Sequence, residues 1–390
     1  MSCGSVVAMS YSRTLVMSYS PTTSITIFTT KHKLPVSYPP ENQRKNLREA
    51  GIMVIQEAIK TVVAGNSLSR EQAVEVFSEI MSGNATDSQI AAFIVALRMK
   101  GETPDEITGA ATVMRLKATS IIPDNREYLI DTCGTGGDSS NTFNISTAAA
   151  LVSAGAGARV AKHGNRSVSS KCGSADVLEA LGVNISIPPE MMKECLDKTG
   201  ICFLFAPALH KAMKYAIAPR KEVGIRTIFN VLGPLTNPSE APCQLMGVFS
   251  PVLTETMAEV LKNMGSKRGF VVHGMDSLDE ISISADTRIS ELDNGTIRSY
   301  FIKPEDFQIK RSALGDITGG DPQRNAEMIR AVLSGEKGPP RNIVLLNAAF
   351  AIAASGLAHS PHEGFVLAEE SIDSGAAKDK LDTLVEFTNQ

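Results

Sequence analysis

The sequence predicts an α/β protein, with a small N-terminal helical domain and a larger α/β domain built on a mainly parallel central sheet. Two observations carry this prediction. Over residues 46–118, apolar residues recur at helical spacing between short polar breaks. From residue 127 onward, short apolar runs alternate with helical segments, which is the order that gives parallel strands joined by crossover helices.

The N-terminal segment differs in composition from the rest of the chain. Its first forty residues hold fourteen Ser or Thr residues, three basic residues and no acid before Glu41. This composition is typical of an organelle transit peptide and lacks the compact apolar block of a secretory signal. A disordered tail or a mispredicted start is the alternative. Residues 1–48 are therefore expected to be a transit peptide or a disordered extension, which places the protein in the plastid (chloroplast) stroma, or alternatively in the cytoplasm.

Residues 49–118 are predicted to form the helical domain, completed by helices around residues 205–235. Its second helix is expected to follow Ser69, because a serine before a polar and apolar alternation is a good N-cap. Asp87 is expected to open the third helix. Pro104 opens the fourth, with acidic residues at the positive end of the helix dipole.

Residues 119–390 are predicted to form the α/β domain. The segments expected to be strands are Tyr128–Thr132, Ala158–Ala161, Ile201–Phe205, Gly269–His273 and Ile343–Leu346. A helix over Thr147–Ala154 is expected after the first strand, and Asp293-Asn-Gly295 predicts a tight turn in a surface hairpin. Parallel strands gather ligands at their carboxyl ends, so polar residues that follow these strands are candidates for a site.

Composition argues against several classes of partner. The formal net charge of -4 gives no general attraction to nucleic acid or acidic lipid, and no apolar run is long enough for a membrane span. The six cysteines are scattered without a CxxC pair, which argues against a zinc site and a disulfide framework. Aromatic residues make up 5% and Trp is absent, which disfavours base stacking. Neither nucleic acid nor a membrane is expected as a partner.

A glycine-rich loop, Asp131-Thr-Cys-Gly-Thr-Gly-Gly-Asp138, follows the first expected strand. Such a loop lets backbone N–H groups converge on an anion, although an ordinary tight turn has the same composition. The hydroxyls of Ser146 and Thr147, at the start of an Ala-rich helix, can add donors to a phosphate or a ligand to Mg²⁺. Asp138 suits sugar hydroxyls or a hydrated cation, with an N-cap as the alternative.

A second cluster, Lys162-His-Gly-Asn-Arg166, follows the second expected strand. Basic residues at a strand end can hold a pyrophosphate or neutralise a leaving group. Asn165 can accept a hydrogen bond from an amine while donating elsewhere. A solvated surface pair is the alternative for the Lys-His dipeptide, but the glycine and the amide in the same five positions favour a functional site.

Two further groups complete the candidate residues. Asp279 and Glu280 are adjacent acids after the strand Gly269–His273, and such a pair is costly unless a cation neutralises it. Oxygen ligands without nearby Cys or His favour Mg²⁺, whereas a solvated acidic turn is the alternative. His210 and Arg220 are expected to span a helix that Pro219 ends. Arg220 could clamp a carboxylate, or could be a solvated residue with a packed stem.

Together these segments resemble the anthranilate phosphoribosyltransferase family. The resemblance runs from about Ile55 nearly to the C-terminus, and its motifs are Ile90–Thr103, Asp131–Asp138, Asn144–Thr147, Lys162–Arg166, Ser169–Gly182, Arg220–Pro238 and Asp279-Glu280. It implies a fold of the nucleoside phosphorylase/phosphoribosyltransferase type and a homodimer through the helical domain. It also implies Mg²⁺-dependent transfer of a phosphoribosyl group from phosphoribosyl pyrophosphate to the amine of anthranilate, a step of tryptophan biosynthesis.

The family's site residues carry over to positions of this chain. The phosphoribosyl pyrophosphate site maps to Gly134, Thr135, Gly137, Asp138, Asn144, Ser146, Thr147 and Lys162. The Mg²⁺ ligands correspond to Ser146, Asp279 and Glu280, and the anthranilate site corresponds to His163, Asn165, His210 and Arg220. The loop bearing Ser174 would close over the pyrophosphate. The catalytic residues implied are Lys162, His163 and Arg220, with the role of His163 as a base left open.

The chain departs from the family's pattern at two places. Lys211 stands where proline is more frequent, and Ser277 stands where glycine is usual. Both put the shape of a local loop in question more than the chemistry. A pyrimidine nucleoside phosphorylase shares the architecture, but its phosphate-binding lysine and base-reading motif are not found after Lys162. A nucleic-acid-binding relative would need a basic face, and a Rossmann dehydrogenase would need a GxGxxG loop.

Overall fold

The computed structural model describes residues 7–10, 13–16, 54–137, 140–167 and 171–390. The chain divides into two compact units, Met1–Met53 and Val54–Gln390. In the first unit, strands β1 (Val7–Ser10) and β2 (Arg13–Val16) pair antiparallel. The rest of the predicted transit peptide or extension, residues 1–48, lies outside the described residues.

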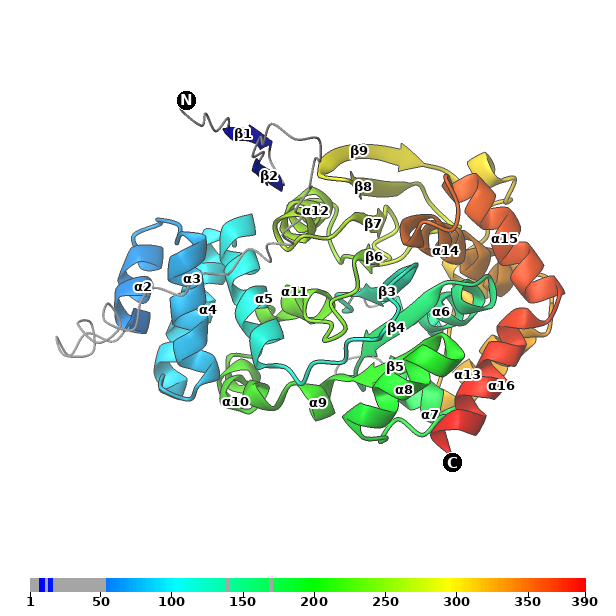
Figure 1. The fold of residues 1–390 in the computed structure, drawn as a ribbon, viewed down its shortest axis with the longest axis horizontal. Helices are drawn as coiled ribbons and strands as arrows, with labels where there is room; N and C mark the ends of the chain where they lie inside the picture. Colours follow the sequence, from blue (N-terminus) through cyan, green and yellow to red (C-terminus); the bar gives the residue numbers. More distant parts are fainter. Residues whose placement is uncertain (1–6, 11–12, 17–53, 138–139, 168–170) are drawn as a thin grey trace, which may run out of the picture. The chain divides into compact units, whose positions relative to one another are not determined.

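The described part of the second unit opens with four helices, α2 (Val54–Val63), α3 (Arg70–Met81), α4 (Asp87–Lys100) and α5 (Pro104–Lys117) (Figure 1). Three of them begin with a capping box. At α3, the Ser69 side chain accepts from the Gln72 N–H, while the Gln72 side chain accepts from the Ser69 N–H. The same arrangement starts α4 and α5. The predicted starts at Ser69 and Pro104 are confirmed, and the helix at Asp87 has Thr86 as its N-cap.

Seven strands of the described chain form the central sheet, in the order β5-β4-β3-β6-β7-β8-β9. Their bounds are β3 Leu129–Gly134, β4 Arg159–Gly164, β5 Ile201–Phe205, β6 Cys243–Gly247, β7 Arg268–Gly274, β8 Thr287–Asp293 and β9 Thr296–Ile302. All pairs from β5 to β7 are parallel, and β8 and β9 add antiparallel. The mainly parallel sheet is therefore confirmed. Asn294 and Gly295 form the predicted hairpin turn, and both have positive φ.

Helices cover the sheet and form most of the core. They are α6 (Ile145–Gly155), α7 (Ser174–Ala180), α8 (Pro189–Thr199), α12 (Leu253–Asn263), α13 (Pro322–Leu333), α14 (Pro339–Ser355), α15 (Pro361–Asp373) and α16 (Ala376–Thr388). The 3-10 turns η3 (Pro304–Phe307) and η4 (Leu314–Ile317) follow β9. α6 packs on β3 and β4, and α14 packs on α6, β6 and β7. No helix among the described residues is both long and apolar enough to cross a membrane.

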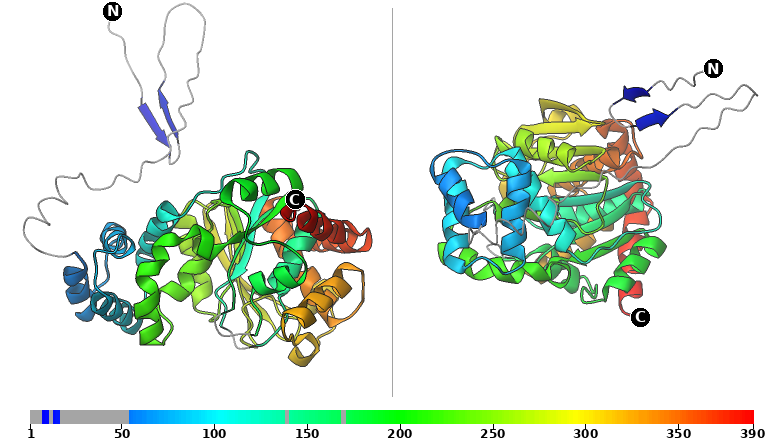
Figure 2. Two further views of the ribbon diagram at one scale, coloured as in Figure 1. Left: turned by 90° about the horizontal axis from the view of Figure 1, so that it is seen from below. Right: turned by 60° about the vertical axis from the view of Figure 1, so that its left-hand side comes forward.

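A string of short elements runs from β5 back to the helical bundle. It comprises α9 (Ala206–Leu209), η1 (Lys211–Met213), α10 (Lys214–Val223), α11 (Phe229–Leu232) and η2 (Gly233–Leu235). α10 packs on α3 and α4, and α11 packs on α5. In Figure 2 these helices lie beside the bundle, and the sheet separates them from the C-terminal helices. The segment that carries His210 and Arg220 thus lies where the bundle meets the sheet.

The structure corrects two expectations and adds one strand that was not expected. Ile343–Leu346 is not a strand but part of the 17-residue helix α14, and a helix buried on nearly every side has no apolar period to distinguish it from a strand. Pro219 does not end its helix. It lies inside α10, which continues to Val223 and ends at Gly224 in the left-handed conformation. The central strand β6 was not predicted, because Gln244 interrupts its apolar pattern.

Candidate functional site

The glycine loop and the Lys162 cluster meet at one edge of the sheet. β3 ends at Gly134 and its parallel neighbour β4 ends at Gly164, so the loops after both strands emerge on the same side. β7 also ends at this edge, at Gly274, shortly before the Asp279-Glu280 pair. The expected gathering of polar groups at the carboxyl ends of parallel strands is confirmed.

The glycine loop is anchored to β6. The Thr135 N–H donates to the Gly247 carbonyl at 2.9 Å, and the Thr135 hydroxyl accepts from the Phe249 N–H at 3.1 Å. Gly136 and Gly137 then have φ of +66° and +77°, a conformation that side chains with a Cβ rarely adopt. The loop is therefore a fixed left-handed turn, and Asp138, which follows it, lies outside the described residues.

Asp279 and Glu280 form hydrogen bonds with the glycine loop and with the start of α6. One oxygen of Asp279 accepts from the Gly136 N–H at 2.7 Å, and one oxygen of Glu280 accepts from the Ser146 N–H at 3.2 Å. A Cβ on Gly247 would lie 1.6 Å from the Asp279 carbonyl oxygen, so the acidic turn approaches as closely as glycine permits. These contacts distinguish the pair from a solvated acidic turn.

The oxygen atoms at this point fit a magnesium ion. The half-buried carboxylates of Asp279 and Glu280 are adjacent in the chain, Glu280 contacts the backbone N–H of the hydroxyl-bearing Ser146, and hard oxygen donors are what Mg²⁺ prefers. Mg²⁺ takes few protein ligands and completes its shell with water and phosphate oxygens, so this small donor set suffices.

Lys162 places its ammonium between β3 and α6. Its Nζ donates to the Thr132 carbonyl at 2.6 Å and lies 3.3 Å from the Ser146 hydroxyl. The side chain is only 3% exposed. Burial lowers the pKa of Lys162, and the carboxylate of Asp131 opposes this shift. A buried cation therefore lies beside the candidate magnesium ligand.

Asp131 lies next to the candidate site, although sequence reasoning assigned no role to it. It is 1% exposed, and its Oδ1 accepts from the His163 N–H at 3.1 Å. Its other oxygen has no hydrogen-bond partner among the described residues. Burial raises the pKa of Asp131, whereas contacts with Asn237 and the charge of Lys162 lower it. An acid in the middle of an apolar strand was the signal that could have singled it out.

His163 and His210 form a buried pair across 47 positions of sequence. Their Nε2 atoms are 3.1 Å apart, and the rings meet edge to face with centroids 5.0 Å apart. Burial lowers the pKa of His163 to about 3, with a further contribution from His210, and burial lowers the pKa of His210 to about 4. Both rings are therefore neutral at pH 7, and the pair can share one N–H donor.

This pair predicts an acid-sensitive stability. Since the folded pKa values lie below the usual 6.5, the unfolded chain binds protons first as the pH falls. The contribution is complete above about pH 6.5 and should decline toward pH 4, at up to about 1.4 kcal/mol per pH unit for each histidine. Urea unfolding at pH 7 and pH 5 measures the free energy of unfolding, and this free energy should fall less between the two pH values in His210→Asn than in wild type. His362→Asn, which changes an exposed ring, should keep the wild-type dependence; equal losses in all three proteins would refute this role.

Arg220 is half-buried on α10. Its guanidinium lies 5.0 Å from the centroid of the Phe229 ring, and burial lowers its pKa. Among the described residues, no carboxylate forms an ion pair with Arg220, and no hydrogen bond joins it to His163. The structure thus presents an oriented cation whose charge is not matched by a described acid.

Asn144, Asn165 and Ser174 belong to a network behind the glycine loop. The Asn144 amide donates to the Cys172 carbonyl at 3.3 Å and accepts from the Asn325 amide at 3.0 Å. The Ser174 hydroxyl, at the start of α7, donates to the Asn165 carbonyl at 3.3 Å. Asn325 was missed in the sequence, where an asparagine inside an ordinary helix gives no signal. This network links α6, α7 and α13.

Thr147 lies deeper than its neighbour Ser146. Its side chain is buried, and its hydroxyl has no hydrogen-bond partner among the described residues. It lines a small internal cavity together with Lys162 and apolar side chains of β5 and α16. The structure therefore brings Ser146 into contact with the acid pair and places the Thr147 hydroxyl behind Lys162.

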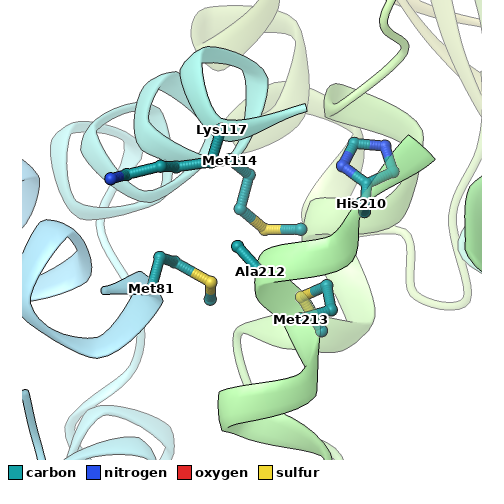
Figure 3. Close-up of a pocket in the computed structure, with 6 residues that line it drawn as sticks. All are labelled: Met81, Met114, Lys117, His210, Ala212 and Met213. Carbon is teal, nitrogen blue, oxygen red and sulfur yellow. The ribbon is translucent and has the colours of Figure 1, made fainter. Parts of the chain in front are cut away.

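A small pocket lies between the helical bundle and the start of α10, next to the histidine pair. Its lining residues are Met81, Met114, Lys117, His210, Ala212 and Met213 (Figure 3). Methionines from α3, α5 and η1 converge on it, and His210 forms one wall. Flexible, polarizable thioethers adapt readily to a flat aromatic ring. The cavity as it stands has a volume of only about 10 Å³, so an aromatic ring would enter it only after these methionines rearrange.

Comparison with known proteins places this architecture in a family. The chain matches two glycosyl transferase family profiles, the helical bundle domain over residues 56–118 and the a/b domain over residues 126–378. The anthranilate phosphoribosyltransferase of Acetivibrio thermocellus is 56% identical over 336 residues, which is 86% of this chain and 97% of that protein. That of Moorella thermoacetica is 56% identical over 332 residues, which is 85% and 98% of the two chains.

Solved structures agree with the sequence relatives. The crystal structure of the Thermus thermophilus anthranilate phosphoribosyltransferase superposes with a TM-score of 0.81 at 42% identity, covering 85% of this chain and 99% of that one. The Saccharomyces cerevisiae enzyme, in complex with PRPP and Mg, gives a TM-score of 0.78 at 27% identity, covering 86% and 98%. This chain belongs to the anthranilate phosphoribosyltransferase family.

Proposed function

We propose that the chain transfers the 5-phosphoribosyl group from phosphoribosyl pyrophosphate to the amine of anthranilate, giving N-(5-phosphoribosyl)anthranilate and pyrophosphate in tryptophan biosynthesis. The observation that carries the proposal is the convergence of the glycine loop, Lys162 and the Asp279-Glu280 pair around Ser146. The names of the relatives support the same reaction. The yeast structure with PRPP and Mg supports the donor and the metal.

On the donor side, we assign the phosphates to the loop Gly134–Gly137 and to the residues around Ser146, and we assign the sugar hydroxyls or a hydrated cation to Asp138. Ser146, Asp279 and Glu280 would hold Mg²⁺, which supplies positive charge to the pyrophosphate when bound. The ammonium of Lys162 is already oriented by the Thr132 carbonyl, so it needs no reorganisation to stabilise charge on the departing group. Asn144, Thr147 and the segment that begins at Ser174 complete the assigned donor site.

The chemistry favours a mechanism led by departure of the pyrophosphate. An aromatic amine is a weak nucleophile, so the C1–O bond breaks ahead of C–N bond formation and the ribose acquires oxocarbenium character. With a pKa of about 3, His163 is a weak base and does not remove a proton from the neutral amine. It accepts a hydrogen bond that orients the amine. The ammonium formed by C–N bond formation is acidic enough to lose its proton to a weak acceptor.

On the acceptor side, we assign the anthranilate carboxylate to Arg220 and the amine to the groups around His163, His210 and Asn165. Arg220 supports this assignment because Phe229 orients its planar guanidinium, which can bind a carboxylate in a bidentate way. The methionines next to His210 offer an adaptable apolar surface to the aromatic ring, which would need them to rearrange. Holding the ring and the carboxylate leaves the amine as the group that faces C1 of the ribose.

Arg220→Gln is therefore expected to raise the KM for anthranilate by about tenfold to a hundredfold, because a charged hydrogen-bonded pair is lost. The KM for phosphoribosyl pyrophosphate should stay close to that of wild type. Steady-state kinetics with each substrate varied in turn measures both values. Arg298→Gln provides a control, because Arg298 is an exposed arginine on β9 that pairs with Glu291. An unchanged anthranilate KM in Arg220→Gln would disprove the assignment.

The proposed reaction has a direct assay. Fluorescence of anthranilate should fall when the protein, phosphoribosyl pyrophosphate and Mg²⁺ are all present, and should persist when any one is omitted. Phosphorolysis of thymidine would instead indicate a nucleoside phosphorylase. A salt-dependent shift of DNA in a gel, without consumption of anthranilate, would favour a nucleic-acid-binding relative.

We also propose a homodimer through the helical domain, residues 49–118, with the α/β domain in residues 119–390. The helical part exposes apolar side chains, including Met99 at 83% and Val63 at 71%, which is the kind of surface a second copy would cover. Light scattering on Met99→Glu should show monomers if this face is the interface.

The composition of residues 1–48 supports import into plastids. An import assay with isolated chloroplasts tests this, and failure of import would favour the cytoplasm.

A further inference from the structure

Arg226 lies in the connection between α10 and α11 and reaches across to the glycine loop. Its Nη2 donates to the Gly137 carbonyl, 89 positions away in the sequence. Its guanidinium stacks over the Phe249 ring, 4.4 Å from the ring centroid. Among the described residues, no carboxylate forms an ion pair with Arg226. The arginine is thus held by a ring on one side and a backbone carbonyl on the other.

The ring that orients Arg226 is itself attached to the same loop. The Phe249 N–H donates to the Thr135 hydroxyl at 3.1 Å, and the Thr135 N–H donates to the Gly247 carbonyl at 2.9 Å. Arg226, Phe249 and the loop therefore form a closed set of contacts. The next residue, Thr227, is buried and receives an anchor of its own, because its N–H donates to the Asn230 amide oxygen at 3.0 Å.

The bond to the Gly137 carbonyl bears directly on anion binding. A glycine loop binds phosphate through its N–H groups only when its carbonyl oxygens, the negative ends of the peptide dipoles, point elsewhere. Gly137 has a φ of +77°, and a Cβ there would lie 2.8 Å from Arg226 Nη2. The guanidinium thus sits directly against the loop, where it holds one carbonyl and offsets its negative end.

We infer that Arg226 is a positioning residue for the phosphoribosyl pyrophosphate site, which fixes the Gly137 carbonyl away from the phosphates and adds positive charge beside them. The inference rests on the proposed function. Arg220 lies in the last turn of α10, which ends at Val223, and Arg226 follows it by six residues. One short segment therefore carries both the acceptor arginine and the arginine of the donor loop. Sequence reasoning missed Arg226, because nothing local distinguishes it from a solvated arginine.

Three variants separate charge, geometry and the ring that orients the side chain. Arg226→Gln should raise the KM for phosphoribosyl pyrophosphate by about tenfold to a hundredfold, the range for a hydrogen bond to a charged group, and should leave the KM for anthranilate unchanged. Arg226→Lys keeps the charge but loses the planar fork, so its KM for phosphoribosyl pyrophosphate should lie between those of Arg226→Gln and wild type. Phe249→Leu should shift the same KM in the same direction, because the guanidinium loses its support.

Arg288→Gln is the matched control. Arg288 also stacks on a phenylalanine, Phe301, but it lies on β8, next to the edge strand β9, so the KM values of Arg288→Gln should equal those of wild type. Thermal unfolding establishes which variants are folded, and Arg226→Lys and Phe249→Leu carry the test if Arg226→Gln is not. A wild-type KM for phosphoribosyl pyrophosphate in the folded Arg226 variants, or an equal rise for both substrates, would overturn the inference.

The outcome is distinguishable from failure of the proposed function. If the wild-type protein does not consume anthranilate, the reaction is wrong, whatever the variants do. Calorimetric titration with phosphoribosyl pyrophosphate and Mg²⁺ then still measures donor binding directly. Weaker binding by Arg226→Gln than by wild type and Arg288→Gln would support the role of Arg226. Equal binding by all three proteins would contradict that role.

Discussion

Lys162→Met is expected to lower kcat by about two to three orders of magnitude, the usual effect of removing one preorganised donor from a developing anion. The ammonium is buried, and it is oriented by the Thr132 carbonyl at 2.6 Å and the Ser146 hydroxyl at 3.3 Å. It therefore acts on the departing pyrophosphate without rearrangement. The KM values should change less than kcat, because the interaction strengthens as charge develops. Steady-state and single-turnover measurements of anthranilate fluorescence give both quantities.

Lys380→Met is the matched control for this experiment. Lys380 also donates to a backbone carbonyl, that of Thr199 at 2.7 Å, and burial likewise lowers its pKa. It lies on α16, away from the candidate site. The control variant should lose some stability and keep the wild-type kcat. Equal losses of kcat in both variants would mean that Lys162 serves the fold rather than the reaction.

Asp279→Asn and Glu280→Gln should each raise the Mg²⁺ concentration needed for half-maximal activity by at least about tenfold to a hundredfold, the range seen when residues that support a metal site are changed. Both substitutions keep an oxygen that can accept the existing hydrogen bonds from Gly136 and Ser146, so the backbone contacts persist. Only the negative charge is removed. Titration of activity with Mg²⁺ measures the shift, and EDTA should abolish the wild-type activity.

The control for the acid pair is Asp286→Asn. Asp286 pairs with Arg311 at the surface and contacts neither the glycine loop nor α6, so its variant should show the wild-type Mg²⁺ dependence. Activity that survives EDTA in the wild type would remove the proposed metal role. A variant of the acid pair with unchanged Mg²⁺ dependence would remove its residue from the set of ligands.

Local patterns in the sequence predicted much of the fold. Ser69 as an N-cap and Pro104 at the first helical position mark the starts of their helices, since both act on backbone groups only a few positions away. β3, β4 and β7 lie where short apolar runs end in polar residues, and β5 is itself a short apolar run. The errors fall where burial removes the pattern. Ile343–Leu346 lies in a helix surrounded by protein, and β6 carries a buried glutamine as its second residue.

The sequence by itself determined the chemical groups of the candidate site and the strand ends that carry them. The chemistry of the glycine loop, of Lys162 and of the acid pair can be recognised within a few residues, because the residue types and a preceding strand suffice to indicate a binding group. Only the tertiary structure decided which groups meet. His163 touches His210 across 47 positions, and Arg226 reaches the loop across 89. Such contacts depend on how β4, α10 and the helical bundle pack, and no local pattern encodes that packing.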